Sequence, residues 1–305
     1  MKICLSILTT GTRPETLSFC LNSITKLRLP VVDKFSVLIV ENNALPNEGV
    51  VSLINSLSET SDIEFTHVLE PKKGIPYGRN AGLKFAIDNN YSHLAFVDDD
   101  AEIDIEWLYE LVTRLKNDDV QAVTGPQKPI FPKNTKPVFK NATVYKERNL
   151  DDGKLCKWAA TNNVLFDVKF ANENGIWFSE DMKTGGSDKE FFSRYSKAGA
   201  KICWVKNAIV NEYVENERIN FSWAIKRTFR FGGTGYRIEQ SNKGKSLALA
   251  YCFLKGAIYI LKGFLGCLLL PLKKNKSWLD GPCDIAHGVA FFTSVFTGGK
   301  LKKYT

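Results

Sequence analysis

The chain has 305 residues, of which 44% are hydrophobic and 12% aromatic, so it can bury a large core and is not expected to be disordered. Seven cysteines without a C-x-x-C pair and only three histidines argue against a disulfide framework or a zinc cluster, and favour a reducing compartment. The net charge of +8 comes from the carboxyl-terminal part, because residues 1–220 carry 27 Lys and Arg against 30 Asp and Glu, whereas residues 221–305 carry 14 against 3.

Strand and helix signals alternate along the first half, as they do in βαβ units. The predicted strands are Ile3–Leu8, Phe35–Val40, Phe65–Leu69, Leu94–Val97 and Ala122–Thr124, and the predicted helices are Glu15–Lys26, Val50–Leu57, Tyr77–Asn89 and Ile105–Lys116. This alternation predicts an α/β fold. The first apolar run is too short for the core of a signal peptide, so we expect the catalytic body to stay in the cytoplasm.

The pattern changes at Pro126. From there to Asp152 it gives way to Pro, Lys and Asn, which indicates a loop or linker that crosses to a second lobe. Regular structure resumes in Trp158–Phe166, Phe191–Lys197 and Lys201–Val205. With the shift in composition after residue 220, we expect three consecutive segments: residues 1–125, 126–235 and a basic helical tail over 236–305.

Three consecutive carboxylates follow the fourth predicted strand. The apolar run that begins at His93 leads directly into Asp98, Asp99 and Asp100. Ligand sites of open α/β sheets lie outside the carboxyl ends of strands. Three adjacent like charges repel one another unless a cation or solvent offsets them. The run therefore indicates either a divalent cation that holds phosphate oxygens or a solvated Asp-rich turn.

Two other polar segments stand at comparable places. Glu41-Asn42-Asn43 ends a predicted strand and offers acceptors for a base N–H or a ribose hydroxyl. The segment from Gly74 to Gly82 offers a flexible turn and places Arg79 near a helix start, where it suits a diphosphate. Each segment is also explained as an ordinary strand-end turn or helix cap.

Two later segments carry charged groups. Ser187 and Glu190 predict a capping box, and the same helix start projects Asp188 at a position suited to a general base. The pair Glu180-Asp181 lies seven residues upstream and is a rival for that role. Further along, three arginines on neighbouring helical faces suit either phosphate binding or a solvated basic face, namely Arg218, Arg227 and Arg230.

Taken together and in order, these motifs resemble family 2 inverting glycosyltransferases of the GT-A fold. The resemblance covers roughly residues 1–235. The motifs that carry it are Thr10-Gly11-Thr12-Arg13-Pro14, Glu41-Asn42-Asn43, Gly74 to Gly82, Asp98-Asp99-Asp100 and Gly186-Ser187-Asp188. The tail looks like the basic, partly apolar extension of bacterial members that build surface polysaccharides. The resemblance implies a Rossmann-like mixed sheet flanked by helices, with nucleotide-sugar binding in residues 1–125 and the acceptor and base in 126–235.

The resemblance also implies the ligands and their residues. It implies a nucleotide-diphosphate-sugar donor, a divalent cation (Mn²⁺ or Mg²⁺) and a glycan or lipid-linked saccharide as acceptor. Asp98 and Asp100 would be the metal ligands, Glu41 the uracil contact, Arg79 a donor contact and Asp188 the catalytic base. The full set of implied substrate-binding residues is Thr10, Arg13, Glu41, Asn43, Arg79, Asn80, Asp98, Asp99, Asn163, Arg227 and Arg230.

Three positions depart from the family pattern. Glu41 stands where Asp is usual, Thr12 where Asn is usual, and Ser187 where Glu usually precedes the base. The nucleotide is therefore less well defined than the reaction class. We expect the acceptor near Trp158–Asn163, at the start of the second lobe.

The tail combines basic and apolar residues. Lys255, Lys262 and Lys273 are spaced by 7 and 11 residues, which places them on one helical face. The uncharged runs between them are each shorter than the roughly 20 residues that span a bilayer. This interleaving favours anionic lipid over nucleic acid and predicts a helix in the interface of the inner membrane face. A buried helix pair with snorkelling lysines is the alternative, and the oligomeric state is not defined.

Three other classes compete with glycosyl transfer. A phosphatase with an Asp nucleophile would also begin at an apolar strand, but Glu102 occupies its Thr or Val position. A sugar nucleotidyltransferase needs a Gly/Arg/Lys-rich phosphate loop after the first strand, where Thr9 to Arg13 supplies one Gly and one Arg. A non-enzymatic basic module that binds membrane or nucleic acid explains the tail and leaves the aligned polar sites unexplained.

Overall fold

A computed structural model describes residues 1–183, 185–269 and 277–299 of the chain. The chain folds as two compact units. The first comprises Met1–Lys128, Arg148–Lys183 and Ser187–Glu212, and the second comprises Pro129–Glu147, Thr184–Gly186 and Tyr213–Thr305. Both units are discontinuous in sequence. The three consecutive segments expected from the sequence are functional assignments and stay a prediction.

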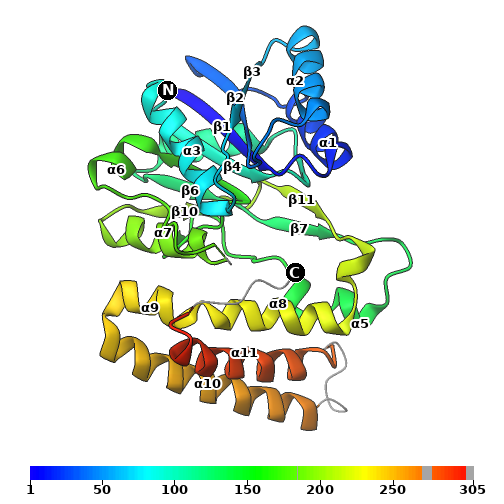
Figure 1. The fold of residues 1–305 in the computed structure, drawn as a ribbon, viewed down its shortest axis with the longest axis vertical. Coiled ribbons are helices and arrows are strands. Elements are labelled where there is room, and N and C mark those ends of the chain that lie inside the picture. Colours follow the sequence, from blue (N-terminus) through cyan, green and yellow to red (C-terminus); the bar gives the residue numbers. More distant parts are fainter. Residues whose placement is uncertain (184, 270–276, 300–305) are drawn as a thin grey trace. The chain divides into compact units, whose positions relative to one another are not determined.

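The first unit is built on an eight-stranded mixed sheet (Figure 1). In spatial order its strands are β3 (Glu64–Leu69), β2 (Lys34–Glu41), β1 (Lys2–Thr9), β4 (His93–Asp98), β9 (Asn163–Asp167), β6 (Ala122–Thr124), β10 (Ile202–Trp204) and β8 (Leu155–Cys156). Strands β1 to β4 are parallel, whereas β9 runs antiparallel to both β4 and β6. The expected mixed sheet of a GT-A fold is thus confirmed.

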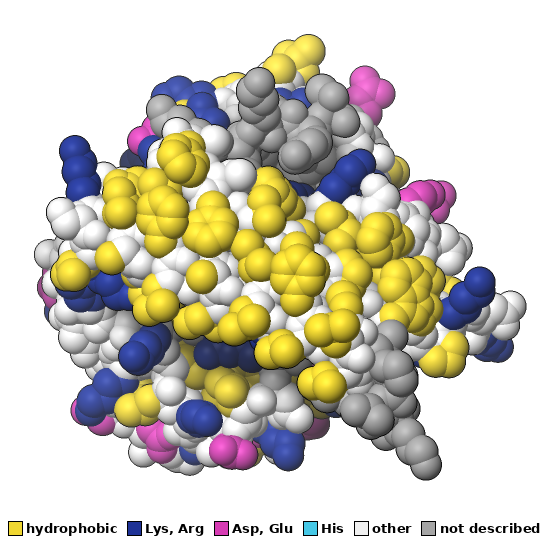
Figure 2. Space-filling model, turned by 90° about the horizontal axis from the view of Figure 1, so that it is seen from below, with side chains coloured by type: hydrophobic (Ala, Val, Ile, Leu, Met, Phe, Trp, Pro, Cys, Tyr) yellow, Lys and Arg dark blue, Asp and Glu magenta, His cyan; other side chains and the backbone are white. Residues whose placement is uncertain are grey.

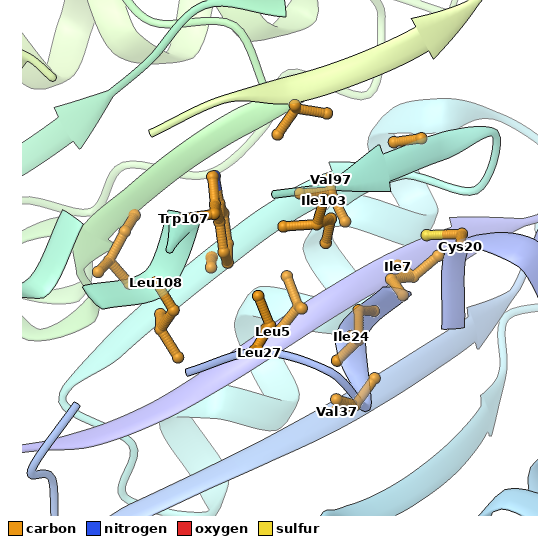
Figure 3. Close-up of a cluster of buried hydrophobic side chains, with 14 of the residues drawn as sticks. Leu5, Ile7, Cys20, Ile24, Leu27, Val37, Val97, Ile103, Trp107 and Leu108 are labelled. Atoms are coloured by element: carbon orange, nitrogen blue, oxygen red, sulfur yellow. The ribbon is translucent and has the colours of Figure 1, made fainter. Parts of the chain in front are cut away.

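Helices cover both faces of this sheet. Because side chains alternate along a strand, Ile3, Leu5 and Ile7 enter one core while Cys4 enters the other. The first core lies under α1 (Pro14–Ile24), α2 (Glu48–Thr60) and α4 (Trp107–Asn117), and Figure 3 shows part of it. The second core lies under α3 (Ile75–Asp88), α6 (Val168–Glu173) and α7 (Ser187–Lys197). These helices hold the carboxyl ends of β1, β2 and β4 in place.

All nine elements predicted for residues 1–125 are present, with ends shifted by a few residues. The three-residue strand β6 was predicted, but other short strands were missed: β5 (Ala101–Ile103), β7 (Gln127–Ile130) and β11 (Val210–Tyr213) form a second sheet in the order β5-β11-β7. The predicted loop over residues 126–152 contains β7, α5 (Pro137–Lys140) and a 3₁₀ turn, Thr143–Tyr145. Strands of three or four residues are too short to show a periodic pattern.

The second unit is mainly helical. It contains α8 (Phe221–Gly233), α9 (Gly235–Lys243), α10 (Lys245–Leu268) and α11 (Asp280–Phe296). Helices α10 and α11 lie side by side because glycines face each other across their contact (Figure 1). A Cβ atom on Gly263 would lie 2.7 Å from the Gly281 carbonyl oxygen, and one on Gly288 would lie 2.5 Å from the Gly256 carbonyl oxygen. The helix pair therefore depends on these small residues.

We expect Gly263→Ala to lower the melting temperature relative to Gly266→Ala. Both positions lie inside α10, so both variants gain the same helix propensity of about 1 kcal/mol. At Gly266 the added Cβ has its nearest neighbour at 3.6 Å, which is ordinary contact, whereas at Gly263 it meets atoms at 2.6 Å. Overpacking costs about 1–3 kcal/mol. Thermal unfolding by circular dichroism tests this, and equal melting temperatures would contradict the packing described.

Helix α10 is longer than any of the uncharged runs in the tail. The helix continues through Lys255 and Lys262 for 24 residues. Its most apolar window has a mean hydropathy of 1.5, and 22% of that window is buried, so by length and composition it is able to cross a membrane. The uncharged runs are short because lysines interrupt them, not because the helix ends. The predicted position of Lys273 lies outside the described residues.

Candidate active site

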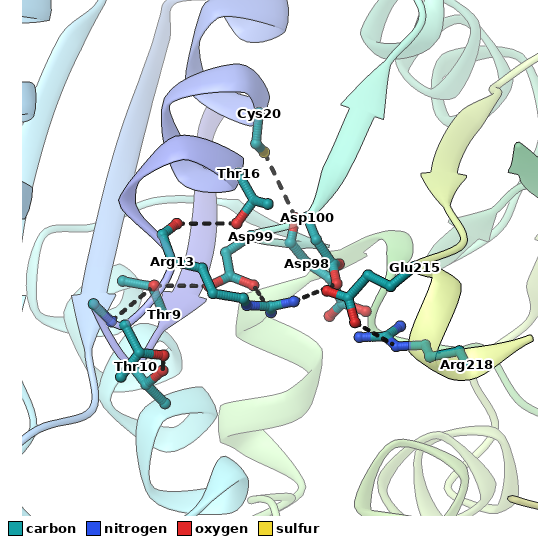
Figure 4. Close-up of polar contacts among 12 residues, drawn as sticks. Thr9, Thr10, Arg13, Thr16, Cys20, Asp98, Asp99, Asp100, Glu215 and Arg218 are labelled. Atoms are coloured by element: carbon teal, nitrogen blue, oxygen red, sulfur yellow. Dashed lines mark hydrogen bonds and ion pairs between the residues drawn. The ribbon is translucent and has the colours of Figure 1, made fainter. Parts of the chain in front are cut away.

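The carboxyl ends of β1 and β4 are joined by a cluster around the Asp triplet (Figure 4). Asp99 accepts hydrogen bonds from the Thr9 hydroxyl at 2.7 Å and from Arg13 Nη2 at 2.9 Å. Arg13 Nη1 donates to Asp100 Oδ2 at 3.1 Å. Because Arg13 stands at the start of α1, it ties that helix to the end of β4. Sequence reasoning missed Thr9, whose only signal was its place at the end of the first strand.

Asp98 is a partly buried carboxylate whose negative charge is disfavoured by its surroundings. Burial raises the pKa of Asp98 to about 7, Arg79 lowers it, and Asp100 and Glu212 raise it further. A hard divalent cation prefers oxygen ligands and would offset this negative charge. Within the described ranges, no group of three or more His, Cys, Asp or Glu side chains is placed to hold a metal. Asp98 and Asp100 supply oxygen donors of the kind that such a cation takes, and their role as metal ligands stays a prediction.

Arg79 links the end of β4 to the start of α7. Its Nη1 donates a hydrogen bond to the Ser187 hydroxyl at 2.8 Å. Burial lowers the pKa of Arg79, while the negative charges of Asp188 and Asp98 raise it. The structure thus brings three of the predicted site residues into one electrostatic cluster. A guanidinium is suited to an anionic ligand such as a phosphate.

Asp188 lies in the first turn of α7. Gly185 and Gly186 precede it with φ angles of +128° and +80°, which glycine adopts without strain. The predicted capping box does not form, because both of its side chains have other partners. Arg194 Nε and Nη2 donate to the Glu190 carboxylate at 2.6 and 2.8 Å, and the Ser187 hydroxyl accepts from Arg79. Asp188 is partly exposed and accepts from the backbone N–H of Lys189 at 2.8 Å. It is thus held at the helix start and remains open to a ligand.

The rival pair Glu180-Asp181 lies in the loop before α7, and both side chains are exposed. Neither is among the charges that act on Arg79, whereas Asp188 is. The choice between Asp188 and Asp181 as the base stays a prediction.

The segment that ends β2 is more enclosed than the sequence indicated. Glu41 is fully buried, its Oε1 accepts from the backbone N–H of Asn47 at 2.8 Å, and its Oε2 lies 3.0 Å from His67 Nε2. Asn42 donates to the carbonyl oxygens of Glu70 at 2.9 Å and Lys72 at 2.7 Å. These contacts shape the loop between β3 and α3. His67 was missed, since a lone histidine inside a strand carries no motif.

Two residues expected to bind substrate make hydrogen bonds inside the protein. Asn163 is fully buried: its Oδ1 accepts from Trp107 Nε1, and its Nδ2 donates to the carbonyl oxygens of Pro126 and Ala208. Asn80 makes a two-way hydrogen bond with the backbone of Phe178, at 2.9 and 2.8 Å. The Asn163 amide is thus fully used inside the protein, whereas the partly exposed Asn80 keeps one N–H, and the substrate-binding role of both residues stays a prediction.

The other residues that were predicted to bind substrate lie in different parts of the structure. The hydroxyls of Thr10 and Thr12 lie 2.8 Å apart near the surface. Asn43 accepts from the backbone N–H of Ala44 at 3.0 Å. Arg227 and Arg230 both lie on α8, in the second compact unit, where the Arg227 guanidinium lies 5.0 Å from the centre of the Phe231 ring.

Part of the predicted acceptor segment lies near the base. Lys189, the neighbour of Asp188, places its Nζ 5.9 Å from the centre of the Trp158 ring. Arg148 lies over the same ring at 4.6 Å. Trp158 is partly exposed, so an aromatic surface lies beside the residue after Asp188.

Sequence comparison identifies relatives of this chain. Residues 7–171 match the family described as Glycosyl transferase family 2. The chain is 28% identical over 234 residues to the succinoglycan biosynthesis protein ExoM of Rhizobium meliloti strain 1021, which covers 74% of this chain and 72% of ExoM.

Solved structures share the fold. A mannosyltransferase from Pyrobaculum calidifontis, solved with GDP-Man and Mn²⁺, has a TM-score of 0.61 and 16% identity over 97% of this chain and 87% of its own. TarS of S. aureus has a TM-score of 0.53 and 16% identity over 75% of this chain. This chain spans 39% of the TarS chain. At these identities the likeness concerns the fold alone.

Proposed function

The chain belongs to glycosyl transferase family 2, an inverting family, and on that basis we propose that it transfers a sugar from a nucleotide-diphosphate donor to a hydroxyl of a glycan or lipid-linked acceptor. The observation that carries this proposal is the cluster of Asp98, Arg79 and Asp188 at the ends of β4 and α7. The likeness to ExoM supports a role in surface polysaccharide synthesis. Family membership favours transfer over the phosphatase, the nucleotidyltransferase and the non-enzymatic module.

The donor is proposed to bind at the carboxyl ends of β1, β2 and β4. Asp98 and Asp100 would hold a divalent cation, Mn²⁺ or Mg²⁺, and the likeness to a mannosyltransferase solved with Mn²⁺ supports this. When bound, the cation would neutralise charge that develops on the leaving diphosphate. Arg79 supplies a second positive charge at the same place. Glu41 remains our candidate for the uracil contact, which requires its side chain to move from its present partners.

Asp188 is proposed as the general base. Its carboxylate takes the proton of the acceptor hydroxyl as that oxygen bonds to the anomeric carbon. The bond from this carbon to the diphosphate oxygen breaks on the opposite face, and its electron pair leaves with the diphosphate. The configuration at the anomeric carbon is inverted without a covalent intermediate. Trp158 lies near this base and is our candidate for the acceptor side.

The position in the cell is part of the same proposal. We place the enzyme at the cytoplasmic face of the cell membrane, because residues 221–305 carry 14 basic against 3 acidic residues and include the apolar helix α10. A lipid-linked acceptor would be reached from this surface. Nucleic acid is not proposed as a partner, and the oligomeric state is left open.

A panel of nucleotide sugars, tested by thermal shift with and without Mn²⁺, examines the donor assignment. We expect at least one UDP- or GDP-sugar to raise the melting temperature when Mn²⁺ is present, and to raise it less when EDTA removes the metal. A nucleoside triphosphate with a sugar 1-phosphate serves as the control for a nucleotidyltransferase. Stabilisation by that pair alone would contradict glycosyl transfer.

A further inference from the structure

Helix α10 carries a ridge of exposed apolar side chains. The ridge consists of Leu247, Leu254, Ile258, Leu261, Leu265 and Leu268, whose exposed fractions run from 47% to 74%. At about 100° per residue these positions fall within one stripe of the helix surface. The opposite face, which includes Gly256 and Gly263, packs on α11. Figure 2 shows hydrophobic side chains gathered in a broad band on the face to which α10 belongs.

A hollow that two lysines help to line lies along one flank of this ridge. Its volume is about 360 Å³, and its lining residues are Tyr251, Leu254, Lys255, Ile258, Tyr259 and Lys262. Lys255 Nζ lies 3.2 Å from the Tyr251 hydroxyl, and Lys262 Nζ lies 5.4 Å from the centre of the Tyr259 ring. The two lysines expected on one helical face are thus neighbours in the structure. Leu254 and Ile258 belong to both the hollow and the ridge, so the two features are continuous.

The charges in the hollow favour an anion. Lys262 pairs with Asp284 at 2.9 Å. For Lys255, the described part of the chain provides a tyrosine hydroxyl and aromatic rings but no ion pair with a carboxylate. Two ammonium groups with one carboxylate leave net positive charge, and the tyrosine hydroxyl can donate a further hydrogen bond. A phosphate group matches this set of donors.

We propose that ridge and hollow together dock the protein onto an anionic phospholipid membrane, with the ridge among the acyl chains and a lipid phosphate in the hollow. A lipid is the one ligand class that presents an apolar part and an adjacent anionic headgroup to a continuous surface of this kind. The excess of basic residues after position 220 matches the negative potential of such a membrane. The proposal deepens the membrane position proposed above and does not depend on the chemistry of sugar transfer.

The positions of the charges indicate that α10 lies in the membrane plane. With a rise of about 1.5 Å per residue, its 24 residues are long enough to cross a bilayer. However, crossing would place Lys255, Lys262 and the partner Asp284 near the bilayer centre, where charged side chains are costly. In the lying orientation the ridge enters the apolar region while the hollow, on its flank, stays at headgroup level.

Sedimentation of the full-length protein with liposomes tests the docking surface. The vesicles are phosphatidylcholine alone, or an equimolar mixture with phosphatidylglycerol, each at low and high salt. We expect binding to the mixed vesicles that salt weakens. The double variant Lys255→Ala/Lys262→Ala should bind them about 30-fold less tightly at low salt, since each basic residue contributes roughly fivefold. The double variant Leu261→Glu/Leu265→Glu should lose at least about tenfold on both vesicle types.

Matched controls lie on the first unit. Lys84→Ala/Lys169→Ala removes the same charge from two exposed helix positions, and Val31→Glu places a charge at a side chain that is 90% exposed. Both control variants should bind vesicles as the unchanged protein does. Circular dichroism checks that each variant is folded, and the donor thermal shift with Mn²⁺ should be unchanged in all of them. If the donor with Mn²⁺ does not raise the melting temperature of the unchanged protein, this result contradicts the proposed function and leaves the docking proposal intact.

Five outcomes would overturn the proposal. The first is no pelleting of the unchanged protein with either vesicle type. The second is equal binding by the ridge variant and its control. Resistance of the membrane-bound protein to carbonate extraction would show a spanning helix instead. If the protein binds inorganic phosphate as tightly as it binds mixed vesicles, the hollow is a site for a free anion. If the protein forms a dimer in solution that only the ridge variant dissociates, the surface binds a second copy of this chain.

Discussion

Asp188→Asn should lower kcat by about 100-fold or more while leaving KM for the donor and the melting temperature nearly unchanged. The amide has the shape of the carboxylate and keeps an oxygen for the Lys189 backbone N–H, but it does not accept the acceptor's proton. Steady-state kinetics with a nucleotide-sugar donor and its acceptor extract measure the change. Thermal shift with the donor and Mn²⁺ measures binding separately.

The control for this experiment is the rival pair in the preceding loop. Asp181→Asn and Glu180→Gln alter exposed carboxylates outside the Arg79 cluster, so both should keep most of the activity. If Asp181→Asn instead reproduces the kinetic loss and Asp188→Asn is active, the base lies in that loop and the assignment of Asp188 is wrong.

Asp100→Ala should abolish both sugar transfer and the Mn²⁺-dependent binding of a nucleoside diphosphate. A hard cation loses one of only two protein carboxylates proposed to hold it, and the other ligands do not compensate. Isothermal titration with UDP or GDP, with Mn²⁺ or EDTA present, measures binding without any need for an acceptor. Asp100 also binds Arg13, so Asp100→Asn is included to retain an oxygen for that contact.

Asp119→Ala is the matched control for the metal variant. Asp119 is an exposed aspartate whose partner is Lys201, away from the cluster, and its loss should leave nucleotide affinity unchanged. Equal affinity of Asp100→Ala and the unchanged protein for a nucleoside diphosphate in Mn²⁺ would rule out the metal assignment.

The sequence alone was sufficient to predict the elements with a strong hydrophobic pattern. Ile3–Leu8 and Leu94–Val97 are continuous apolar runs that become β1 and β4, and the polar residues after them meet at one edge of the sheet. Because parallel strands end at the same edge, the proximity of Arg13 to Asp99 follows from topology. For the same reason the first half of the fold and the Asp cluster could be predicted together.

Residues whose role depends on partners distant in sequence were not predictable. Asn163 joins Trp107 to the backbone of Pro126 and Ala208, and no local pattern reveals these partners. Glu190 was expected to complete a cap but binds Arg194, because a charged pair four residues apart competes with the cap. The sequence thus does not show which side chains of a motif make hydrogen bonds inside the protein.

The stereochemistry of sugar transfer tests the proposed mechanism most directly. Proton NMR of the first product formed from an α-linked nucleotide sugar, with Mn²⁺ and an acceptor extract, shows the configuration of the new glycosidic bond. Direct displacement with Asp188 as base predicts a β-linked product with release of the nucleoside diphosphate. An α-linked first product would contradict the account.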